Sequence, residues 1–154
     1  MSLVFINYRR RDDAYAAAFL DFFLSQRFGA DQIFRAGRSI PAGEDYETCL
    51  NAAIDHCIAM LVVVGQDWPK SFDRSNASVD WVRVEISKAL KRQIRVIPVL
   101  LSGVPRIRPE ELPPELRSVS RFQYLRFDYR NTEQDLSYIA SELQRSIPQL
   151  ATGT

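Results

Sequence analysis

The stretch that decides the fold of this chain is IAMLVVV, residues 58–64. All seven residues are apolar, so the stretch lacks the polar alternation of a strand with one face in water. A strand that is apolar along its whole length is typical of a parallel sheet, because helices cover both faces of such a sheet. The stretch therefore predicts a buried strand within an α/β fold.

Short segments of similar character alternate with helical patterns along the rest of the chain. Residues 3–8 form a predicted strand, after which Asp12 and Asp13 are placed to cap a helix over 14–28. The other predicted strands are 32–34, 94–100 and a weaker one at 123–127, and the other predicted helices are 44–56, one that begins near 79, and one that carries Leu136, Ile139, Ala140, Leu143 and Ile147. This order predicts a doubly wound α/β fold with a parallel sheet and right-handed crossovers.

Glycine and proline mark the predicted connections. Residues 36–43 and 66–78 are expected to be loops. Pro98 lies inside the fourth predicted strand and has no backbone N–H to donate. That strand is therefore expected to end near Pro98 or to lie beside a sheet edge.

Length and composition indicate an ordinary globular domain. The chain has 154 residues, of which 46% are hydrophobic and 25% are charged, and its formal net charge is +1. These values fit one domain over 1–150, with a polar tail or truncated linker at 151–154. Because the charges nearly cancel, we expect no bulk attraction to nucleic acid or to an anionic membrane. No apolar run approaches the roughly 18 residues of a membrane span, so a cytoplasmic location is expected.

The predicted topology also indicates where a ligand binds. In doubly wound sheets, ligands bind beyond the carboxyl ends of the strands, which selects the loops after Tyr8, Phe34 and Gly65. The loop after Tyr8 has no glycine, which argues against both a dinucleotide fingerprint and a glycine-rich phosphate loop. Asp67 leaves a phospho-receiver open as a minor alternative. His56 is the only histidine and falls on a predicted helix, so no metal site is expected.

One predicted helix opens with DWVRVEI, residues 80–86. Trp81 and Glu85 stand four residues apart and share a helix face beside the apolar stripe. A glutamate at the edge of an apolar face, next to an indole, is partly desolvated, so its charge interacts strongly with a cation that develops nearby. The alternative is a solvated Glu85 that pairs with Lys88 or Arg92.

Five segments, in order, resemble the boxes of a bacterial TIR domain, the Toll/interleukin-1 receptor homology module. They are VFINYRR at 4–10 with Asp12 and Asp13 behind it, the segment from Ile33 and Phe34 through SIPAGED at 39–45, residues 57–65, DWVRVEI at 80–86, and RVIPVL at 95–100. One such box is weak evidence. Five in the family's order, in a chain of this length, are strong evidence.

The resemblance implies a flavodoxin-like α/β fold, a doubly wound sheet of five parallel strands with helices on both faces. Many members of the family cleave the nicotinamide glycosidic bond of NAD+, and the glutamate of their WxxxE motif is closely tied to catalysis. Trp81 and Glu85 match this motif. The resemblance therefore implies that Glu85 contacts the nicotinamide ribose and stabilises the oxocarbenium-like charge that forms as nicotinamide leaves. NAD+ is then a substrate, and no cofactor is expected.

Basic and aromatic residues after the first predicted strand are candidate substrate contacts. Tyr8, Arg9 and Arg10 are expected to stack on a ring and to pair with the pyrophosphate, because a guanidinium matches phosphate bidentately. In the alternative reading, Arg9, Arg10 and Arg11 are solvated and have Asp12 and Asp13 as partners.

Two residues after the third predicted strand are further candidates. Trp68 and Ser71 are expected to line the same pocket as Trp81. For Trp68, packing within the loop is an equally good alternative.

Residues 39–45 match the mobile loop that, in the family, contacts a neighbouring TIR protomer and completes or gates the site. The residues assigned to assembly are Ser39, Ile40, Pro41, Gly43 and Asp45. The chain departs from many relatives at Ala36 and Arg38, where acidic residues are common. These departures bear on the loop and the partner surface and leave the WxxxE motif unchanged.

Two functions from different classes remain open. The first is a TIR-domain NAD+ glycohydrolase that yields nicotinamide and ADP-ribose, or a cyclic form of it, when protomers assemble into a homo-oligomer. The second is a non-catalytic scaffold that binds other TIR domains. The presence of Trp81 and Glu85 favours the enzyme.

Overall fold

A computed structural model of the chain describes residues 2–73 and 79–152. At its centre is one sheet of five parallel strands in the order β2-β1-β3-β4-β5, which confirms the flavodoxin-like, doubly wound fold class. The strands are β1 (Val4–Asn7), β2 (Ile33–Phe34), β3 (Ala59–Val64), β4 (Arg95–Leu101) and β5 (Leu125–Phe127).

The central strand β3 explains why its sequence is apolar throughout. All six of its residues are fully buried. Alternate side chains pack into two separate cores, Met60, Val62 and Val64 on one face of the sheet and Ala59, Leu61 and Val63 on the other. Both faces of the strand are covered, so neither set of positions tolerates a polar side chain.

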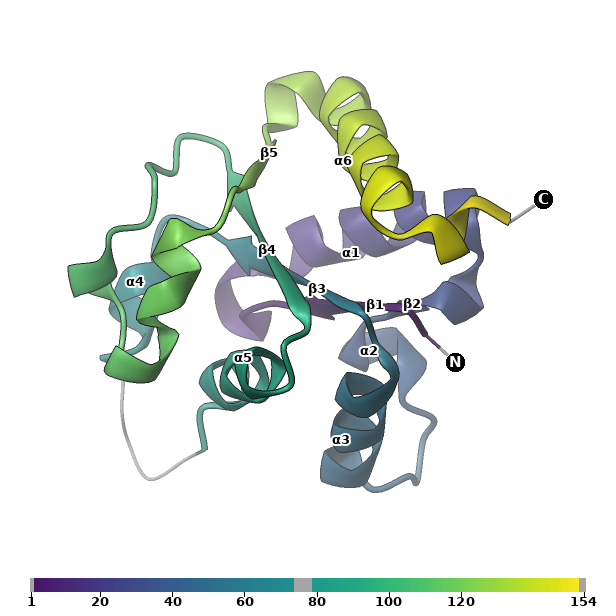
Figure 1. Ribbon diagram of the computed structural model, residues 1–154, viewed down its shortest axis with the longest axis horizontal. Helices are drawn as coiled ribbons and strands as arrows, with labels where there is room; N and C mark the ends of the chain where they lie inside the picture. The colour runs from purple at the N-terminus through teal and green to yellow at the C-terminus, as the bar shows by residue number, and fades with distance from the viewer. Residues whose placement is uncertain (1, 74–78, 153–154) are drawn as a thin grey trace.

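Helices cover both faces of the sheet (Figure 1). The helices α1 (Arg10–Phe28) and α6 (Thr132–Ser146) lie on one face, and α3 (Tyr46–His56), α4 (Trp68–Ser71) and α5 (Trp81–Lys91) lie on the other. The short elements are α2 (Ala36–Ser39) and the 3-10 helices η1 (Ala30–Gln32), η2 (Pro109–Glu111), η3 (Pro114–Arg121), η4 (Tyr129–Asn131) and η5 (Pro148–Thr152).

An aspartate caps each of the two helices that border the candidate site. Asp45 accepts a hydrogen bond from the backbone N–H of Thr48 at 2.9 Å, and α3 begins at the next residue. Asp80 accepts from the backbone N–H of Arg83 at 3.2 Å, and α5 begins directly after it. Each carboxylate satisfies an N–H group that has no partner within its helix, which fixes where the helix starts.

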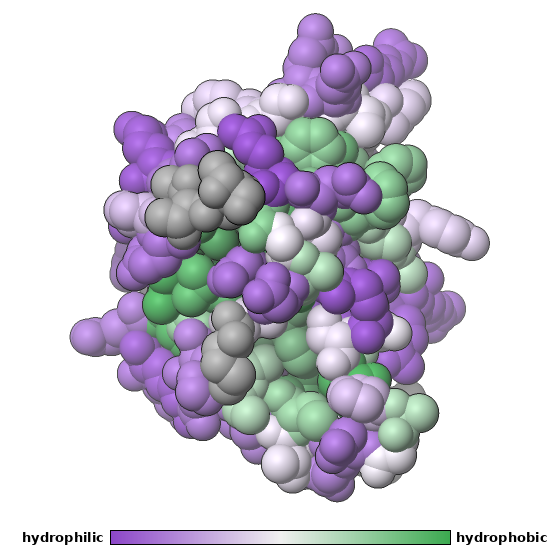
Figure 2. All heavy atoms as spheres, turned by 90° about the vertical axis from the view of Figure 1, so that its right-hand side faces the viewer, coloured by the Kyte–Doolittle hydropathy of each residue, from purple (hydrophilic) through white to green (hydrophobic). Residues whose placement is uncertain are grey.

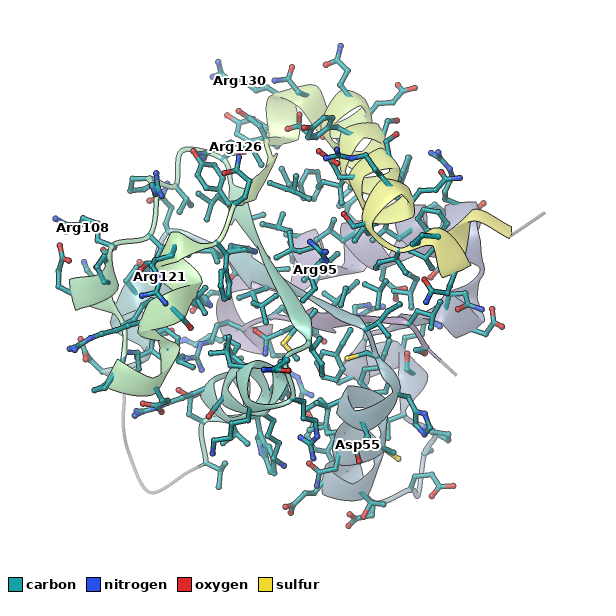
Figure 3. The ribbon with its side chains drawn as sticks, in the orientation of Figure 1. Asp55, Arg95, Arg108, Arg121, Arg126 and Arg130 are labelled. Carbon is teal, nitrogen blue, oxygen red and sulfur yellow. The ribbon has the colours of Figure 1, made fainter. Side chains whose placement is uncertain are left out.

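Several arginines lie on the outer surface, as Figure 3 shows. Arg92, at the end of α5, pairs with Asp55 of α3 at 2.9 Å and so joins the two helices. Both side chains are about half exposed, so the pair contributes little to stability. Figure 3 labels Asp55, together with Arg95 at the start of β4 and Arg108, Arg121, Arg126 and Arg130 on the segments between β4 and α6.

The predicted start of the first helix is wrong. The helix begins at Arg10, and Asp13 lies at a kink inside it, with φ −127° and ψ 19°. The Asp13 carboxylate accepts a hydrogen bond from the backbone of Gly65 instead of capping the helix. A Cβ atom at position 65 would lie only 2.2 Å from Asp13 Oδ1, so this contact between α1 and the end of β3 requires glycine.

The predicted loops contain short helices that periodicity did not indicate. Within the expected loop 36–43, α2 occupies residues 36–39, and within the expected loop 66–78, α4 occupies 68–71. Residues 74–78 of the second loop lie outside the described part of the chain.

The expectation that the fourth strand ends near Pro98 is wrong, because β4 continues to Leu101. Pro98 pairs with Val62 of β3, and pairing with β5 begins only at Val99. On the β5 side Pro98 therefore lies beside an open edge, which agrees with the alternative prediction.

The two ends of the chain lie on the same side of the molecule (Figure 1). Figure 2 views this side, where hydrophobic and hydrophilic residues form interspersed patches. Leu150 is buried against the core formed with α6, and residues 153–154 of the predicted tail lie outside the described chain. Among residues 2–73 and 79–152, no helix has the length and apolarity that a membrane crossing requires.

Candidate active site

A cavity of about 680 Å³ opens at the carboxyl end of β1, between the first turns of α3 and α5. Its walls include Tyr8, Arg10, Tyr46, Ser71, Trp81 and Glu85. The cavity lies at the edge where strand order predicts a ligand site, and its volume is in the range of small-molecule sites.

Glu85 is the buried acid of this cavity. Its side chain is only 7% exposed, and Oε1 accepts a hydrogen bond from Nδ2 of Asn7 at 2.8 Å. Burial raises the pKa of Glu85 to about 7, because it disfavours the charged form. The hydrogen bond from Asn7 lowers this pKa, and the nearby charge of Asp80 raises it, but burial dominates.

The alternative of a solvated Glu85 paired with Lys88 or Arg92 is wrong. The Nζ atom of Lys88 donates to Oδ1 of Asn51 on α3, and Arg92 pairs with Asp55. Within residues 2–73 and 79–152, no lysine or arginine forms an ion pair with Glu85. The carboxylate therefore faces the cavity without a directly bonded cation among these residues.

Asn7 is a residue of this site that sequence reasoning missed. It is the last residue of β1 and is fully buried, and its Nδ2 donates both to Glu85 Oε1 and to the carbonyl oxygen of Val82 at 3.3 Å. The available signal was its place in the strand VFIN. It is the one polar residue of that strand, and it stands at the end where ligands bind.

Two aromatic rings lie together on the cavity wall. Trp81 is half-buried, and its ring meets the ring of Tyr46 edge to face, with centroids 6.0 Å apart and an interplanar angle of 70°. Tyr46, the first residue of α3, was not predicted, because helical periodicity alone does not say which first-turn residue faces a neighbouring helix. The pair offers an apolar wall beside Glu85.

Arg9 is engaged with protein partners instead of being open to a ligand. Its guanidinium donates to both carboxylate oxygens of Asp80, at 2.6 and 3.0 Å, and lies 4.9 Å from the ring centroid of Phe72. The side chain of Arg9 is only 15% exposed, so Arg9 is not solvated, contrary to the alternative reading. The bidentate pair joins the end of β1 to the start of α5, and both residues line the cavity.

Tyr8 and Arg10 lie where the sequence placed them. Both line the cavity, Tyr8 half-buried and Arg10 exposed. The Tyr8 hydroxyl lies close to Gly37 in α2, where an added Cβ atom would be 3.3 Å from the hydroxyl oxygen. Of the three predicted residues after β1, Arg10 has the most solvent-accessible charge.

The prediction that Trp68 lines the pocket is wrong, whereas Ser71 does line it. Trp68 is 1% exposed and packs its ring edge to face against Phe72, with centroids 4.8 Å apart. The first turn of α4 directs this large ring into the core, where burying its apolar surface is most favourable. Packing, the alternative reading for Trp68, is what the structure shows.

The predicted assembly loop borders the cavity. Ile40 packs partly against the core, residues 41–45 are exposed, and Gly43 has a left-handed φ of +88°. Ser39 ends α2, where its hydroxyl accepts from the backbone N–H of Arg35, and Asp45 caps α3. The loop thus runs from α2 to α3 beside the cavity, with Pro41 and Gly43 on its exposed part.

Arg38, one of the departures from related sequences, has a partner in α1. Arg38 and Arg35 donate to the carboxylate of Asp21 at 2.6 and 2.8 Å, and Ser25 donates at 2.7 Å. Burial alone would raise the pKa of Asp21, but the hydrogen bonds from Arg38, Arg35 and Ser25 together lower it. This cluster holds α1 against the segment after β2. Nothing in the structure explains Ala36 beyond its place in the cavity wall.

Metal binding has no evident ligand set in the described chain. Among residues 2–73 and 79–152, no three His, Cys, Asp or Glu side chains are grouped so that they could hold a metal ion. Cys57 is buried, and Cys49 is partly buried and unpaired.

A sequence family model identifies the family of this chain, and solved structures share its fold. The family model for the TIR domain matches residues 4–140, whereas no curated protein matches the chain. The TIR domains of the activated Roq1 resistosome, which directly recognises the pathogen effector XopQ, superimpose with a TM-score of 0.64 at 17% identity, over 96% of this chain and 99% of that one.

A metazoan TIR-STING receptor from C. gigas is also similar. Its complex with 2′,3′-cGAMP matches with a TM-score of 0.59 at 21% identity, and another structure of the receptor matches with a TM-score of 0.57 at 23% identity. The matches cover 89% and 88% of this chain but only 39% of each receptor chain, and at these identities they support the fold alone. With the family model spanning 4–140, the chain belongs to the TIR domain family.

Proposed function

We propose that this domain cleaves the bond between nicotinamide and ribose in NAD+, and that Glu85 is its catalytic residue. The observation that carries the proposal is the buried Glu85 carboxylate, which lines a cavity of about 680 Å³ and forms no ion pair within the described chain. A carboxylate without a bonded cation in a site of low polarity is stabilised when positive charge develops beside it.

The proposed reaction needs few acids and bases. As the bond between C1′ and the pyridinium nitrogen breaks, its electron pair passes to that nitrogen, and neutral nicotinamide leaves. The ribose then carries oxocarbenium-like charge, which Glu85 stabilises. Water adds to C1′ and loses a proton to give ADP-ribose, or a nitrogen of the adenine adds there to give the cyclic form.

The other cavity residues bind the substrate in this proposal. Trp81 and Tyr46 form an apolar wall for a planar ring, and Tyr8 and Ser71 lie elsewhere on the wall. Arg10 is the pyrophosphate contact that needs no rearrangement. Arg9 contributes to pyrophosphate binding only after it exchanges Asp80 for phosphate, because both of its terminal nitrogens are occupied.

Assembly belongs to the same proposal. The loop 39–45, of which residues 41–45 are exposed, would contact a second TIR domain, and the chain on either side of it includes Ala36 and Tyr46, which line the cavity. A neighbour that shifts this loop would therefore also shift a wall of the site. The similarity to the TIR domains of a resistosome supports this part of the proposal.

The direct experiment is to incubate NAD+ with concentrated parent protein, with Glu85→Gln and with Glu142→Gln, and to follow nicotinamide by chromatography. Glu142 lies on α6 and pairs with Arg145, away from the cavity, so it is the matched control. We expect release by the parent and by Glu142→Gln, and a loss of at least about 100-fold in Glu85→Gln.

The alternative is a scaffold that binds other TIR domains and does no chemistry, and the exposed loop is the observation that favours it. No nicotinamide release from the parent, even when protomers are fused or crowded into oligomers, would support the scaffold and reject the enzyme.

A further inference from the structure

The buried amide of Asn7 has an orientation that the surrounding atoms determine. One nitrogen, Nδ2, lies 2.8 Å from Glu85 Oε1 and 3.3 Å from the carbonyl oxygen of Val82. If the amide were turned over, its oxygen would face the carbonyl oxygen of Val82 and the ionised carboxylate of Glu85, which is repulsive. The two N–H bonds of Asn7 therefore point at α5, and its Oδ1 is left without a partner in the described chain.

An unsatisfied, fully buried amide oxygen is a cost that core packing does not explain. Asn7 is 0% exposed, and the rest of β1 is apolar, so a leucine here would add no unpaired oxygen of its own, but it would leave Oε1 of Glu85 without its donor. Its two donated hydrogen bonds both go to the helix that carries Glu85. The amide is thus suited to holding that helix and its carboxylate in one arrangement.

We propose that Asn7 is a positioning residue of this site, whose amide fixes Oε1 of Glu85 and leaves Oε2 as the oxygen that meets the ribose. This role rests on the proposed function of Glu85. The contact between Asn7 and Glu85 is given by the geometry alone. Glu85 has no other hydrogen-bond donor among the described residues, so the two side chains form a pair that spans β1 and α5.

The pair also controls when the carboxylate is charged. A neutral N–H donor favours the ionised carboxylate, and for Glu85 this contact acts against burial. Without Asn7, Glu85 would hold its proton to higher pH and would be free to rotate. Both changes weaken stabilisation of a cation, and neither removes a substrate contact.

Two variants test the inference. Asn7→Leu removes the donor at similar size, and Asn7→Asp keeps the shape but replaces the donor with a second carboxyl. For both, kcat and KM for NAD+ are measured from pH 5.5 to 9, and the Glu85 carboxyl is titrated by ¹³C NMR. Ser120→Ala is the control, because Ser120 is another buried side chain that donates one hydrogen bond but lies outside the cavity.

We expect the acid limb of kcat to move up by about one pH unit in Asn7→Leu and further in Asn7→Asp, since one hydrogen bond to a charged group is worth about that much. At pH 7 kcat for Asn7→Leu then falls about fivefold, because the ionised fraction of Glu85 drops from about one half to about one tenth, while KM changes less than about threefold. The NMR titration of Glu85 moves by the same amount, and Ser120→Ala leaves both unchanged.

Unchanged pH profiles and an unchanged Glu85 titration in a folded Asn7 variant would overturn the inference. If the parent does not cleave NAD+, the proposed function fails, but the NMR titration still decides whether Asn7 controls Glu85. If Asn7→Leu does not fold, Asn7→Asp gives the same comparison, because its side chain has the shape of the original.

Discussion

Two carboxylates in this domain have almost the same low solvent exposure, but their pKa values are shifted in opposite directions. Asp21, on α1, is 2% exposed and accepts hydrogen bonds from two arginines and a serine. Glu85, on α5 across the sheet, is 7% exposed and accepts from a single neutral amide. The pKa of Asp21 lies below its usual value, whereas that of Glu85 is raised to about 7.

In the proposed reaction, this difference separates the structural acid Asp21 from the catalytic acid Glu85. Burial penalises the charged form of both side chains. Arg35 and Arg38 pair with the Asp21 carboxylate, and their hydrogen bonds lower its pKa, so its charge already has partners within the protein. Glu85 lacks such partners and faces a cavity, so a cation formed in that cavity supplies the missing compensation.

The largest expected effect comes from removing the uncompensated charge. Glu85→Gln should lower kcat for NAD+ cleavage by at least about 100-fold, because the neutral amide cannot stabilise the ribose cation. Stability should stay the same or rise, since a buried charge is removed. Urea unfolding and nicotinamide release measure the two effects. A fully active Glu85→Gln would show that the charge of Glu85 does not stabilise the transition state.

Removing the paired charge of Asp21 should instead lower stability and leave activity nearly unchanged. Asp21→Ala should lower the free energy of unfolding by about 3 kcal/mol, because it leaves two guanidinium groups without their partner. Activity per folded molecule should remain within about twofold, since Asp21 lies outside the cavity. The check is chemical unfolding together with kcat at a temperature where the variant is folded. A stable but inactive Asp21→Ala would contradict the account.

The pH dependence of stability should also differ between the two acids. The folded pKa of Glu85 is raised above its usual value, so its contribution to stability is greatest at low pH and is lost as pH rises towards 7. Asp21 has a lowered folded pKa, so its contribution is present at neutral pH and is lost as pH falls below its usual value.

The Glu85→Gln variant separates the pH-dependent contribution of Glu85 to stability from that of Asp21. Between pH 5 and 8 the parent should lose about 2 kcal/mol of stability that the variant keeps, measured by urea unfolding across this range. Over the same range, catalysis should rise with pH, because the ionised form of Glu85 is the active one. Parallel stability curves for parent and variant would mean that Glu85 titrates normally.

The smallest expected effect concerns Arg9, whose charge lowers the pKa of Glu85 without a direct bond. Arg9→Gln releases Asp80 and removes that charge, so the acid limb of kcat should move up by less than one pH unit. The free energy of unfolding should fall by about 1 kcal/mol, because the pair is partly exposed. A loss of activity as large as that of Glu85→Gln would make Arg9, and not Glu85 alone, the decisive charge.

The sheet and the motif helix were predictable because each depends on local patterns. Continuous apolar runs such as residues 58–64 indicated strands covered on both faces, and the structure places all five predicted strands in one parallel sheet. The spacing of Trp81 and Glu85 predicted only that both lie on one helix face, and the resemblance to TIR domains predicted that this face lines the site. Both residues line the cavity.

The rest of the site depends on contacts between segments far apart in the sequence. Asn7 is 78 residues from its partner Glu85, and no local pattern links them. Arg9 and its partner Asp80 are likewise 71 residues apart. Because this pair occupies the guanidinium, Arg9 is not free to bind an anion, contrary to the prediction from the sequence. The prediction for Trp68 was wrong because a tryptophan after a strand end can face either the pocket or the core. In the structure its ring is buried in the core.

The most direct test of the account is a ¹³C NMR titration of the side-chain carboxyl groups of the parent protein, with Glu85→Gln and Asp21→Asn used to assign the two signals. We expect Glu85 to titrate near pH 7, while Asp21 in the same sample remains ionised below its usual pKa. A Glu85 signal that titrates near 4.5, as in an exposed glutamate, would contradict it.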